Sequence, residues 1–283
     1  MRSEEGRTKS EEFNSPSKEE KSKIENSTLR HQRNNSKIKI QNSYSLSYSL
    51  PSIRGGVSRD ERRGGGASGG VASTPLTLDS YILSHSDPEG DYLYRLYRAT
   101  NIHTIHGRMA SGHLQGRLLK MLVQMMRPKN ILEIGTFSGY SALCMAEGLE
   151  DGAMLYTFEI NDEMEDFTRP WIENSPYADK ITFTIGDANL LAPKLGVTFD
   201  MAFLDGDKRT YLETYENILP LMNPGGVIMA DNTLWDGHVV DSAYNHDKQT
   251  HGIELFNDFV AQDPRVTRVI LPLRDGLTLI RKK

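Results

Sequence analysis

The chain has 283 residues, a formal net charge of −5 and a single cysteine, Cys144. One cysteine excludes an intrachain disulfide and favours a reducing compartment, so we expect a cytoplasmic protein. No apolar run approaches the roughly 18 residues that a membrane span requires. Acidic residues interrupt the first dozen positions, which disfavours a secretory signal. We therefore expect no membrane partner.

The composition changes near residue 76. Residues 1–76 are rich in Ser, Asn, Gly, Lys and Arg, and contain 14 Lys and Arg against 9 Asp and Glu. This composition predicts a disordered, low-complexity basic tail over residues 1–76. Residues 77–283 predict one globular domain with a sizeable core. That domain carries about −10, because the tail contributes about +5 to the total of −5. Such an acidic domain argues against a broad nucleic-acid-binding surface.

The globular part begins with two expected helices, over 92–100 and 112–126, and Pro128 ends the second. Short apolar strands then alternate with amphipathic helices, a pattern that predicts an α/β fold with a parallel sheet and right-handed crossovers. The seven expected strands are Ile131–Ile134, Met154–Phe158, Ile181–Ile185, Phe199–Leu204, Val227–Ala230, Arg265–Leu271 and Leu277–Arg281. The helices between them are expected at Tyr140–Gly148, Asp162–Asn174, Asn189–Leu195, Thr210–Met222 and Ile253–Gln262.

The last two strands should form a hairpin. Only residues 272–276 separate them, and Asp275-Gly276 is a hairpin turn signal. The final strand should therefore run antiparallel to the rest of the sheet.

Polar side chains follow two of the buried strands. Asp205 comes after the strand that ends at Leu204, and Asp231 and Asn232 come after the next one. Parallel sheets bind ligands at the carboxyl ends of their strands, so these three side chains could converge there. Two carboxylates and an amide oxygen suit Mg²⁺, Ca²⁺ or Mn²⁺ better than zinc, and of these Mg²⁺ is our first expectation. Each residue could instead only cap a turn or a helix.

A glycine-containing turn, residues 133–141, follows the first strand. Its glycines would allow close approach of a ligand or, equally, tight packing. The spacing differs from G-x-G-x-x-G, which disfavours a nicotinamide-dependent oxidoreductase. The second strand ends at Glu159, which could hold a ribose, and Asp187 after the third strand could accept from an adenine amine. Glu159 could also be a simple capping carboxylate.

Three segments together resemble the cation-dependent class I O-methyltransferases, the family that includes caffeoyl-CoA and catechol O-methyltransferases. They are E-I-G-T-F-S-G-Y-S at 133–141, L-D-G-D-K-R-T-Y at 204–211 and G-G-V-I-M-A-D-N-T-L-W-D-G at 225–237. The resemblance implies a Rossmann-like class I methyltransferase fold, a seven-stranded, mostly parallel sheet with an antiparallel last strand. It also implies a homodimer.

The resemblance assigns roles to individual residues. Metal would bind to Asp205, Asp231 and Asn232. Met109 lies in a segment that would close over the cofactor, and Met109, Trp235 and Tyr244 are substrate candidates. The contacts to S-adenosylmethionine (SAM) would come from Ser111, Glu133, Gly135, Thr136, Ser141, Glu159, Asp187, Ala188 and Asp205.

The expected reaction is methylation of a vicinal dihydroxy aromatic, of the catechol or caffeoyl type. A phenol has a pKa of about 10 and is a poor nucleophile at neutral pH. A divalent cation lowers that pKa, and Lys208 beside it could take the proton. Asp205 and Lys208 are therefore the catalytic candidates. Trp235 and Tyr244 could alternatively cover the edge of the domain.

Two other functions remain open from the sequence. One is methylation of 5-hydroxyuridine in tRNA, which the basic tail favours and the acidic domain disfavours. The other is a non-catalytic module that binds SAM or a nucleotide. The cluster of Met121, Met125 and Met126 is expected to pack in the core and at an interface.

Overall fold

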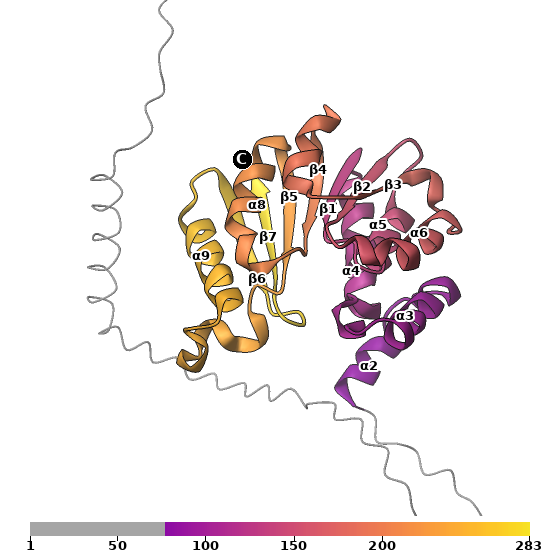
Figure 1. Cartoon of the computed structure of the whole chain (residues 1–283), viewed down its shortest axis with the longest axis horizontal. Coiled ribbons are helices and arrows are strands. Elements are labelled where there is room, and N and C mark those ends of the chain that lie inside the picture. The colour runs from indigo at the N-terminus through magenta and orange to yellow at the C-terminus, as the bar shows by residue number, and fades with distance from the viewer. Residues whose placement is uncertain (1–76) are drawn as a thin grey trace, which may run out of the picture. The chain divides into compact units, whose positions relative to one another are not determined.

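A computed structural model describes residues 77–283, so the predicted tail over 1–76 lies outside the described residues. The described part is a seven-stranded sheet with helices on both faces (Figure 1). The strand order is β3-β2-β1-β4-β5-β7-β6; β1 to β5 pair in parallel, and β7 is antiparallel to β5 and β6. This confirms the predicted Rossmann-like fold with its antiparallel last strand. The strands are β1 (Asn130–Ile134), β2 (Met154–Glu159), β3 (Ile181–Ile185), β4 (Phe199–Leu204), β5 (Met222–Asp231), β6 (Val266–Leu271) and β7 (Leu277–Lys282).

The helices follow the prediction with local differences. A first helix was not predicted; Thr77 caps it by accepting a hydrogen bond from Ser80 N. The expected helix over 210–222 ends as an α-helix at Ile218 and is followed by a 3-10 helix (Leu219–Leu221) that contains Pro220. The strand expected at 227 begins at Met222. No helix within 77–283 is both long and apolar enough to cross a membrane. The helices are α2 (Leu78–Ser84), α3 (Asp91–His103), α4 (Gly112–Met126), α5 (Tyr140–Gly148), α6 (Glu165–Glu173), α7 (Ala188–Leu191), α8 (Tyr211–Ile218) and α9 (Lys248–Gln262).

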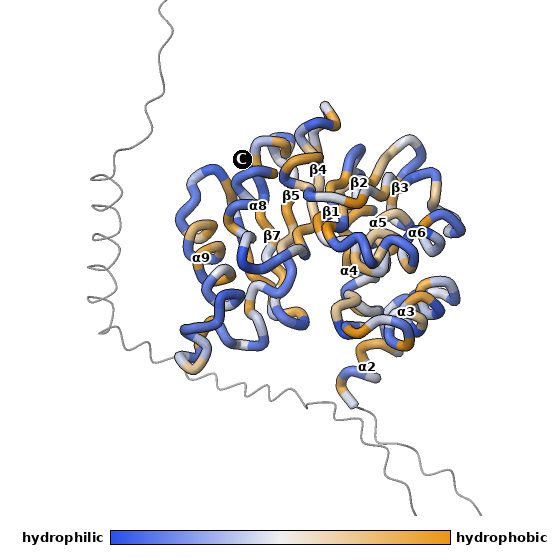
Figure 2. The backbone as a smooth tube through the Cα atoms, viewed as in Figure 1, coloured by the Kyte–Doolittle hydropathy of each residue, from blue (hydrophilic) through white to orange (hydrophobic). Residues whose placement is uncertain are grey.

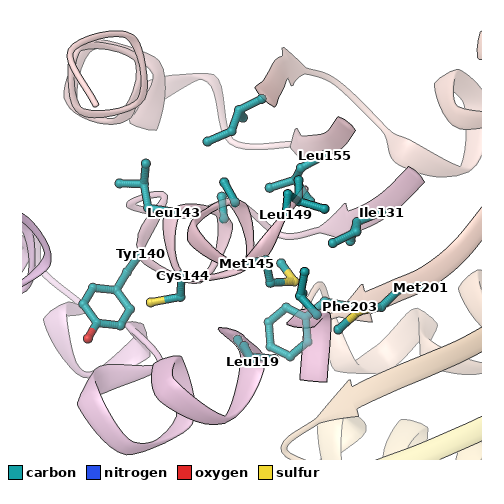
Figure 3. Packing of buried hydrophobic residues seen from close by; sticks show 14 of the residues in the cluster. Leu119, Ile131, Tyr140, Leu143, Cys144, Met145, Leu149, Leu155, Met201 and Phe203 are labelled. Carbon is teal, nitrogen blue, oxygen red and sulfur yellow. The ribbon is translucent and has the colours of Figure 1, made fainter. Parts of the chain in front are cut away.

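Alternation along the strands divides the core into two layers. On β1, Ile131 joins the cluster with α3, α4 and α5, whereas Leu132 joins the cluster with α8 and α9. Met201 and Ala202 of β4 divide in the same way, because successive strand residues face opposite sides of a sheet. Figure 2 shows the apolar residues concentrated in the central strands, and Figure 3 shows α5 packed among side chains of α4, β1 and β4. Two packed layers thus hold the central strands in place.

One part of the α4 prediction is wrong. Met121 and Met125 are 54% and 73% exposed, so they do not pack in the core of this chain. They lie on the same helix as Leu122 and Met126, which line an apolar groove together with Val227 and Leu279 of the sheet. Their packing at an interface, the second half of the prediction, stays a prediction.

The antiparallel direction of β7 determines where the last hairpin turns. Leu277 pairs with Asp231, so the turn at 272–276 lies at the carboxyl edge of the parallel strands. A parallel β7 would instead have begun at the opposite edge. The hairpin turn therefore reaches the same edge as Asp205 and Asp231.

Candidate active site

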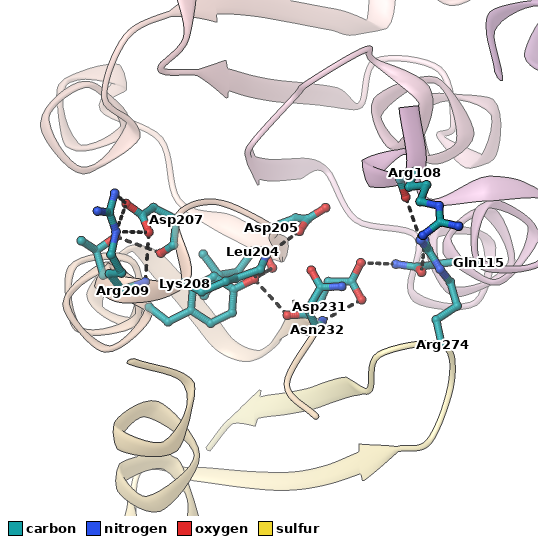
Figure 4. Close-up of polar contacts among 12 residues, drawn as sticks. Arg108, Gln115, Leu204, Asp205, Asp207, Lys208, Arg209, Asp231, Asn232 and Arg274 are labelled. Carbon is teal, nitrogen blue, oxygen red and sulfur yellow. Dashed lines mark hydrogen bonds and ion pairs between the residues drawn. The ribbon is translucent and has the colours of Figure 1, made fainter. Parts of the chain in front are cut away.

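The two acidic strand ends lie side by side. In the parallel pairing of β4 with β5, Leu204 lies opposite Ala230. The next residues, Asp205 and Asp231, therefore lie next to each other at the ends of adjacent strands. Asp231 is 2% exposed, and its Oδ1 accepts a hydrogen bond from Asn232 N at 2.9 Å. Asn232 has φ of +57°, a left-handed conformation that asparagine tolerates better than most residues. Figure 4 shows these side chains at one edge, next to α4.

Lys208 is buried against this acidic pair. Its Nζ donates to Asp205 Oδ1 and to Tyr211 Oη, each at 2.7 Å. Tyr211 Oη lies 2.9 Å from the carbonyl oxygen of Asp231 and 3.1 Å from that of Leu204, and these two acceptors share its single hydroxyl hydrogen. Burial, with Asp205 and Asp231, raises the pKa of Tyr211 well above its usual value, so the phenol keeps its proton. The lysine is thus fixed by groups from β4, β5 and α8.

The acidic pair is electrostatically unfavourable on its own. Burial raises the pKa of Asp205 to about 6, opposed by the charge and hydrogen bond of Lys208 and reinforced by the charge of Asp231. A further positive charge nearby would stabilise the ionised form of Asp205. Lys208 supplies one such charge, and a bound cation would supply more.

The donor set determines which cation could bind. Within 77–283, no three His, Cys, Asp or Glu side chains gather as a metal-binding group. Asp205, Asp231 and Asn232 offer two carboxylates and one amide oxygen. Mg²⁺ is commonly held by one or two carboxylates while other oxygens complete its shell. The residues present therefore fit a cation that is shared with substrate or water.

The glycine turn packs against Asp205 from the other side. Gly135 has φ of +97°, and a Cβ there would lie 2.5 Å from the backbone oxygen of Asp205. At Gly139, with φ of +83°, a Cβ would lie 3.3 to 3.4 Å from the side chains of Ile172 and Thr168. Of the two interpretations of these glycines, tight packing is the one visible in the structure. Gly135 allows β1 and β4 to end in direct contact.

Glu133, the last but one residue of β1, is an unusual buried acid. It is fully buried, and its Oε2 accepts a hydrogen bond from Thr157 Oγ1 at 2.5 Å. Thr157 in turn lies 2.5 Å from the hydroxyl of Thr136. Burial raises the pKa of Glu133 to about 8, although the hydroxyls of Ser141 and Thr157 lower it. Its Oε1 has no hydrogen-bond partner among the described residues. A ligand that carries an ammonium or hydroxyl donor would satisfy this oxygen.

The two other acids of the cofactor prediction hold backbone amides. Glu159 accepts from Phe137 N at 2.7 Å and from Asn161 N at 2.8 Å. Asp187 accepts from Asn189 N at 2.9 Å and caps α7, beside the buried Ala188. The capping roles are therefore present. Each carboxylate oxygen has a second lone pair, so contacts with ribose and adenine remain predictions.

The remaining candidates lie on the segments around the acidic edge. Met109 is 57% exposed at the end of a short 3-10 helix (Gly107–Met109), and Ser111 is buried just before α4. Trp235 opens the irregular 3-10 segment Trp235–Val240 with φ of +46°. Tyr244 stacks on His238 with ring centroids 3.5 Å apart. The stacking covers one face of Tyr244 and leaves it 39% exposed.

Three residues of the site were not foreseen. Tyr211 follows Lys208 by three residues, and this helical spacing could have indicated their contact. Gln115 is a buried polar residue that precedes Leu119 and Leu122 by four and seven positions, so it shares a face of α4 with apolar residues, which is also a recognisable signal. Arg274 lies in the hairpin turn and has no sequence signal.

The comparisons with known proteins decide the family. A family model described as O-methyltransferase matches residues 83–283. The chain belongs to the O-methyltransferase family. Tricin synthase 2 of Oryza sativa subsp. japonica is 37% identical over 219 residues, 73% of this chain and 75% of the relative. Caffeoyl-CoA O-methyltransferase 1 of Eucalyptus globulus is 36% identical over 186 residues, 62% of this chain and 75% of the relative.

A solved structure agrees with this assignment. The SAH-bound methyltransferase PaMTH1 of Podospora anserina has a TM-score of 0.68 and 27% identity, and the match covers 77% of this chain and 99% of that one. The protein is thus a SAM-dependent O-methyltransferase of the caffeoyl-CoA type, and the predicted resemblance is confirmed.

Proposed function

We propose that this O-methyltransferase methylates one hydroxyl of a vicinal dihydroxy aromatic small molecule and requires a divalent cation, with Mg²⁺ favoured. The observation that carries the proposal is the buried amine of Lys208, 2.7 Å from Asp205 and next to Asp231 and Asn232. Relatives named caffeoyl-CoA O-methyltransferase support the class of acceptor. Two adjacent oxygens of such an acceptor would complete a cation shell that these side chains leave partly open.

The chain's residues divide the work between the two reactants. Asp205, Asp231 and Asn232 would hold the cation, which supplies the positive charge that lowers the pKa of a phenol. With the cation compensating the charge of Asp205, Lys208 as the neutral amine would accept the hydroxyl proton, and Tyr211 keeps its Nζ directed at the acidic edge. SAM would supply the methyl group: the acceptor oxygen would bond to the methyl carbon as the bond from that carbon to sulfur breaks, leaving a neutral thioether. Alignment of the two reactants lowers the barrier further.

The cofactor side rests on the turn that follows β1. Glu133 has an unpaired oxygen there, and Ser141 and Thr136 lie in the same turn. Because Gly135 brings this turn against Asp205, a cofactor bound to the turn would lie beside the cation ligands. Asp205 would then contact both reactants.

The test is a methyl-transfer assay with the purified full chain and SAM. Catechol, a caffeoyl ester and undermethylated tRNA are compared, each with EDTA and with EDTA followed by excess Mg²⁺. We expect methylation of the catechol-type acceptors that EDTA abolishes and Mg²⁺ restores. Transfer that persists in EDTA would refute the cation requirement, and transfer only to tRNA would refute the acceptor class. SAM binding without transfer to any hydroxyl acceptor would point to a non-catalytic module.

A further inference from the structure

Gln115 of α4 is a buried amide with both ends engaged. It is 1% exposed, its Nε2 donates to Asp231 Oδ2 at 2.7 Å, and its Oε1 accepts from Arg274 Nη1 at 2.9 Å. A guanidinium only donates and an ionised carboxylate only accepts. A flipped amide would therefore lose both hydrogen bonds. Arg274 thus determines which way Gln115 faces, and so which group it presents to Asp231.

Arg274 reaches this amide from the turn between β6 and β7 (Figure 4). Its Nη1 also donates to the backbone oxygen of Ser111, and its Nη2 lies 3.5 Å from that of Arg108. The residue has φ of +48°, an uncommon conformation for a side chain of this size. One exposed arginine thus joins the hairpin turn to the start of α4.

The same turn holds the chain that follows Asp231. Leu234 N donates to Asp275 O at 2.7 Å, and Thr233 N donates to Gly276 O at 3.1 Å. The backbone after Asp231 and the carboxylate of Asp231 are therefore supported from one hairpin. The backbone contact is direct, whereas the carboxylate contact passes through Gln115.

We propose that Gln115 and Arg274 are positioning residues that fix the Asp231 carboxylate for cation binding. Oδ1 is held by Asn232 N and Oδ2 by Gln115, so the plane of the carboxylate is set before any cation arrives. Each oxygen keeps a lone pair for the cation. The inference rests on the proposed function, because it needs a cation at Asp231. Loss of a group that orients a metal ligand commonly weakens metal affinity about 10–100-fold.

The order of the contacts makes the proposal specific. Among the described residues Arg274 makes no hydrogen bond to Asp231 and reaches it through Gln115. The positive charge of Arg274 also acts on Asp205, and its loss would not weaken cation binding. Removal of both residues should therefore weaken cation binding no more than removal of Gln115 alone. Two groups that merely stabilise the fold independently would add their effects. If either residue had only a structural role, its substitution would lower the melting temperature without a matching loss of cation affinity.

The experiment titrates Mn²⁺ into the purified full chain and measures free Mn²⁺ by electron paramagnetic resonance. The variants are Gln115→Met, Arg274→Met and the double variant. Gln124→Met is the matched control, since Gln124 is an exposed residue of the same helix. Melting temperatures are recorded for all of them. We expect a dissociation constant about 10–100-fold higher for Gln115→Met and for the double variant, an intermediate value for Arg274→Met, and no change for Gln124→Met.

The outcomes separate the inference from the proposed function. If the wild-type chain binds Mn²⁺ and Gln115→Met binds it equally well, the positioning role is overturned and the proposed function stands. If the wild-type chain shows no saturable Mn²⁺ binding, both are overturned. If Gln115→Met loses its cooperative melting transition, Arg274→Met decides alone, because Arg274 lies on an exposed turn. Unchanged Mn²⁺ affinity in that variant overturns the inference.

Discussion

Substitution of Gly135 by alanine is expected to impair both stability and methyl transfer. Gly135 has φ of +97°, where an L-residue costs about 1–2 kcal/mol. The new Cβ would lie 2.5 Å from Asp205 O, although Cβ atoms in proteins keep about 3.0 Å or more from such atoms. The ends of β1 and β4 must then separate by about 0.5 Å. Overpacking of this kind costs a further ~1–3 kcal/mol.

Gly152→Ala is the matched control for this substitution. Gly152 has φ of +79°, and a Cβ there would have no atom within 4 Å, so only the conformational cost of about 1–2 kcal/mol remains. In a domain of this size each kcal/mol lowers the melting temperature by about 2–4 °C. Gly135→Ala should therefore melt about 2–12 °C below Gly152→Ala in thermal denaturation followed by circular dichroism.

Activity gives a second readout of the same contact. A misplacement of about 1 Å near reacting groups can cost about 100-fold, so a shift of half that size at Asp205 should lower kcat/KM about tenfold. Gly152→Ala should keep the wild-type value, because Gly152 lies in an exposed turn before β2. Equal melting temperatures and equal kcat/KM for the two variants would refute the close approach of Gly135 to Asp205 as the reason for this glycine.

Three further predictions concern the amine, the buried acid and the apolar surface. Lys208→Ala should lower kcat at least about 100-fold, whereas the SAM affinity measured by calorimetry should change little. The control Lys194→Ala, at an exposed position, should leave both quantities unchanged. Unchanged turnover in Lys208→Ala would remove Lys208 from the mechanism. The pKa of Glu133 is about 8 against an ordinary 4.5, so the folded chain keeps a proton that the unfolded chain releases, and stability should fall as pH rises between these values. Without cofactor, the melting temperature of Glu133→Gln should fall less between pH 5 and pH 8 than that of the wild-type chain. An identical fall in the two proteins would show that another group titrates. Met125→Lys should convert the predicted homodimer to a monomer in light scattering, because Met125 is 73% exposed beside an apolar groove; a monomeric wild-type chain would contradict this.

The sheet was predictable because its signals are local. Each strand from β1 to β4 is a short apolar run, and alternation with helices implies parallel neighbours whose carboxyl ends share an edge. That reasoning predicts that Asp205, Asp231 and Lys208 lie close together. The early start of β5 was missed because residues 223–226, Asn-Pro-Gly-Gly, have the composition of a turn.

The residues that support the site were less accessible to sequence reasoning. Gln115 contacts Asp231 across 116 positions and Arg274 across 159, and no local pattern links such partners. The role of Gly135 was also ambiguous, since a glycine that faces a ligand and one that faces a neighbouring strand have the same sequence signature. Its contact with Asp205 depends on the register between β1 and β4.

The reversed direction of β7 also determines where Lys283 lies. Its last residues pair with the beginning of β6, and Lys283 N donates to Arg265 O at 2.9 Å, at the amino edge of the parallel strands. Asp205 and Asp231 lie at the opposite edge. An affinity tag, a fusion partner or a linker to a solid support can therefore be attached after Lys283 and leave the catalytic edge open to solution. The fold thus provides a natural point for immobilising the enzyme.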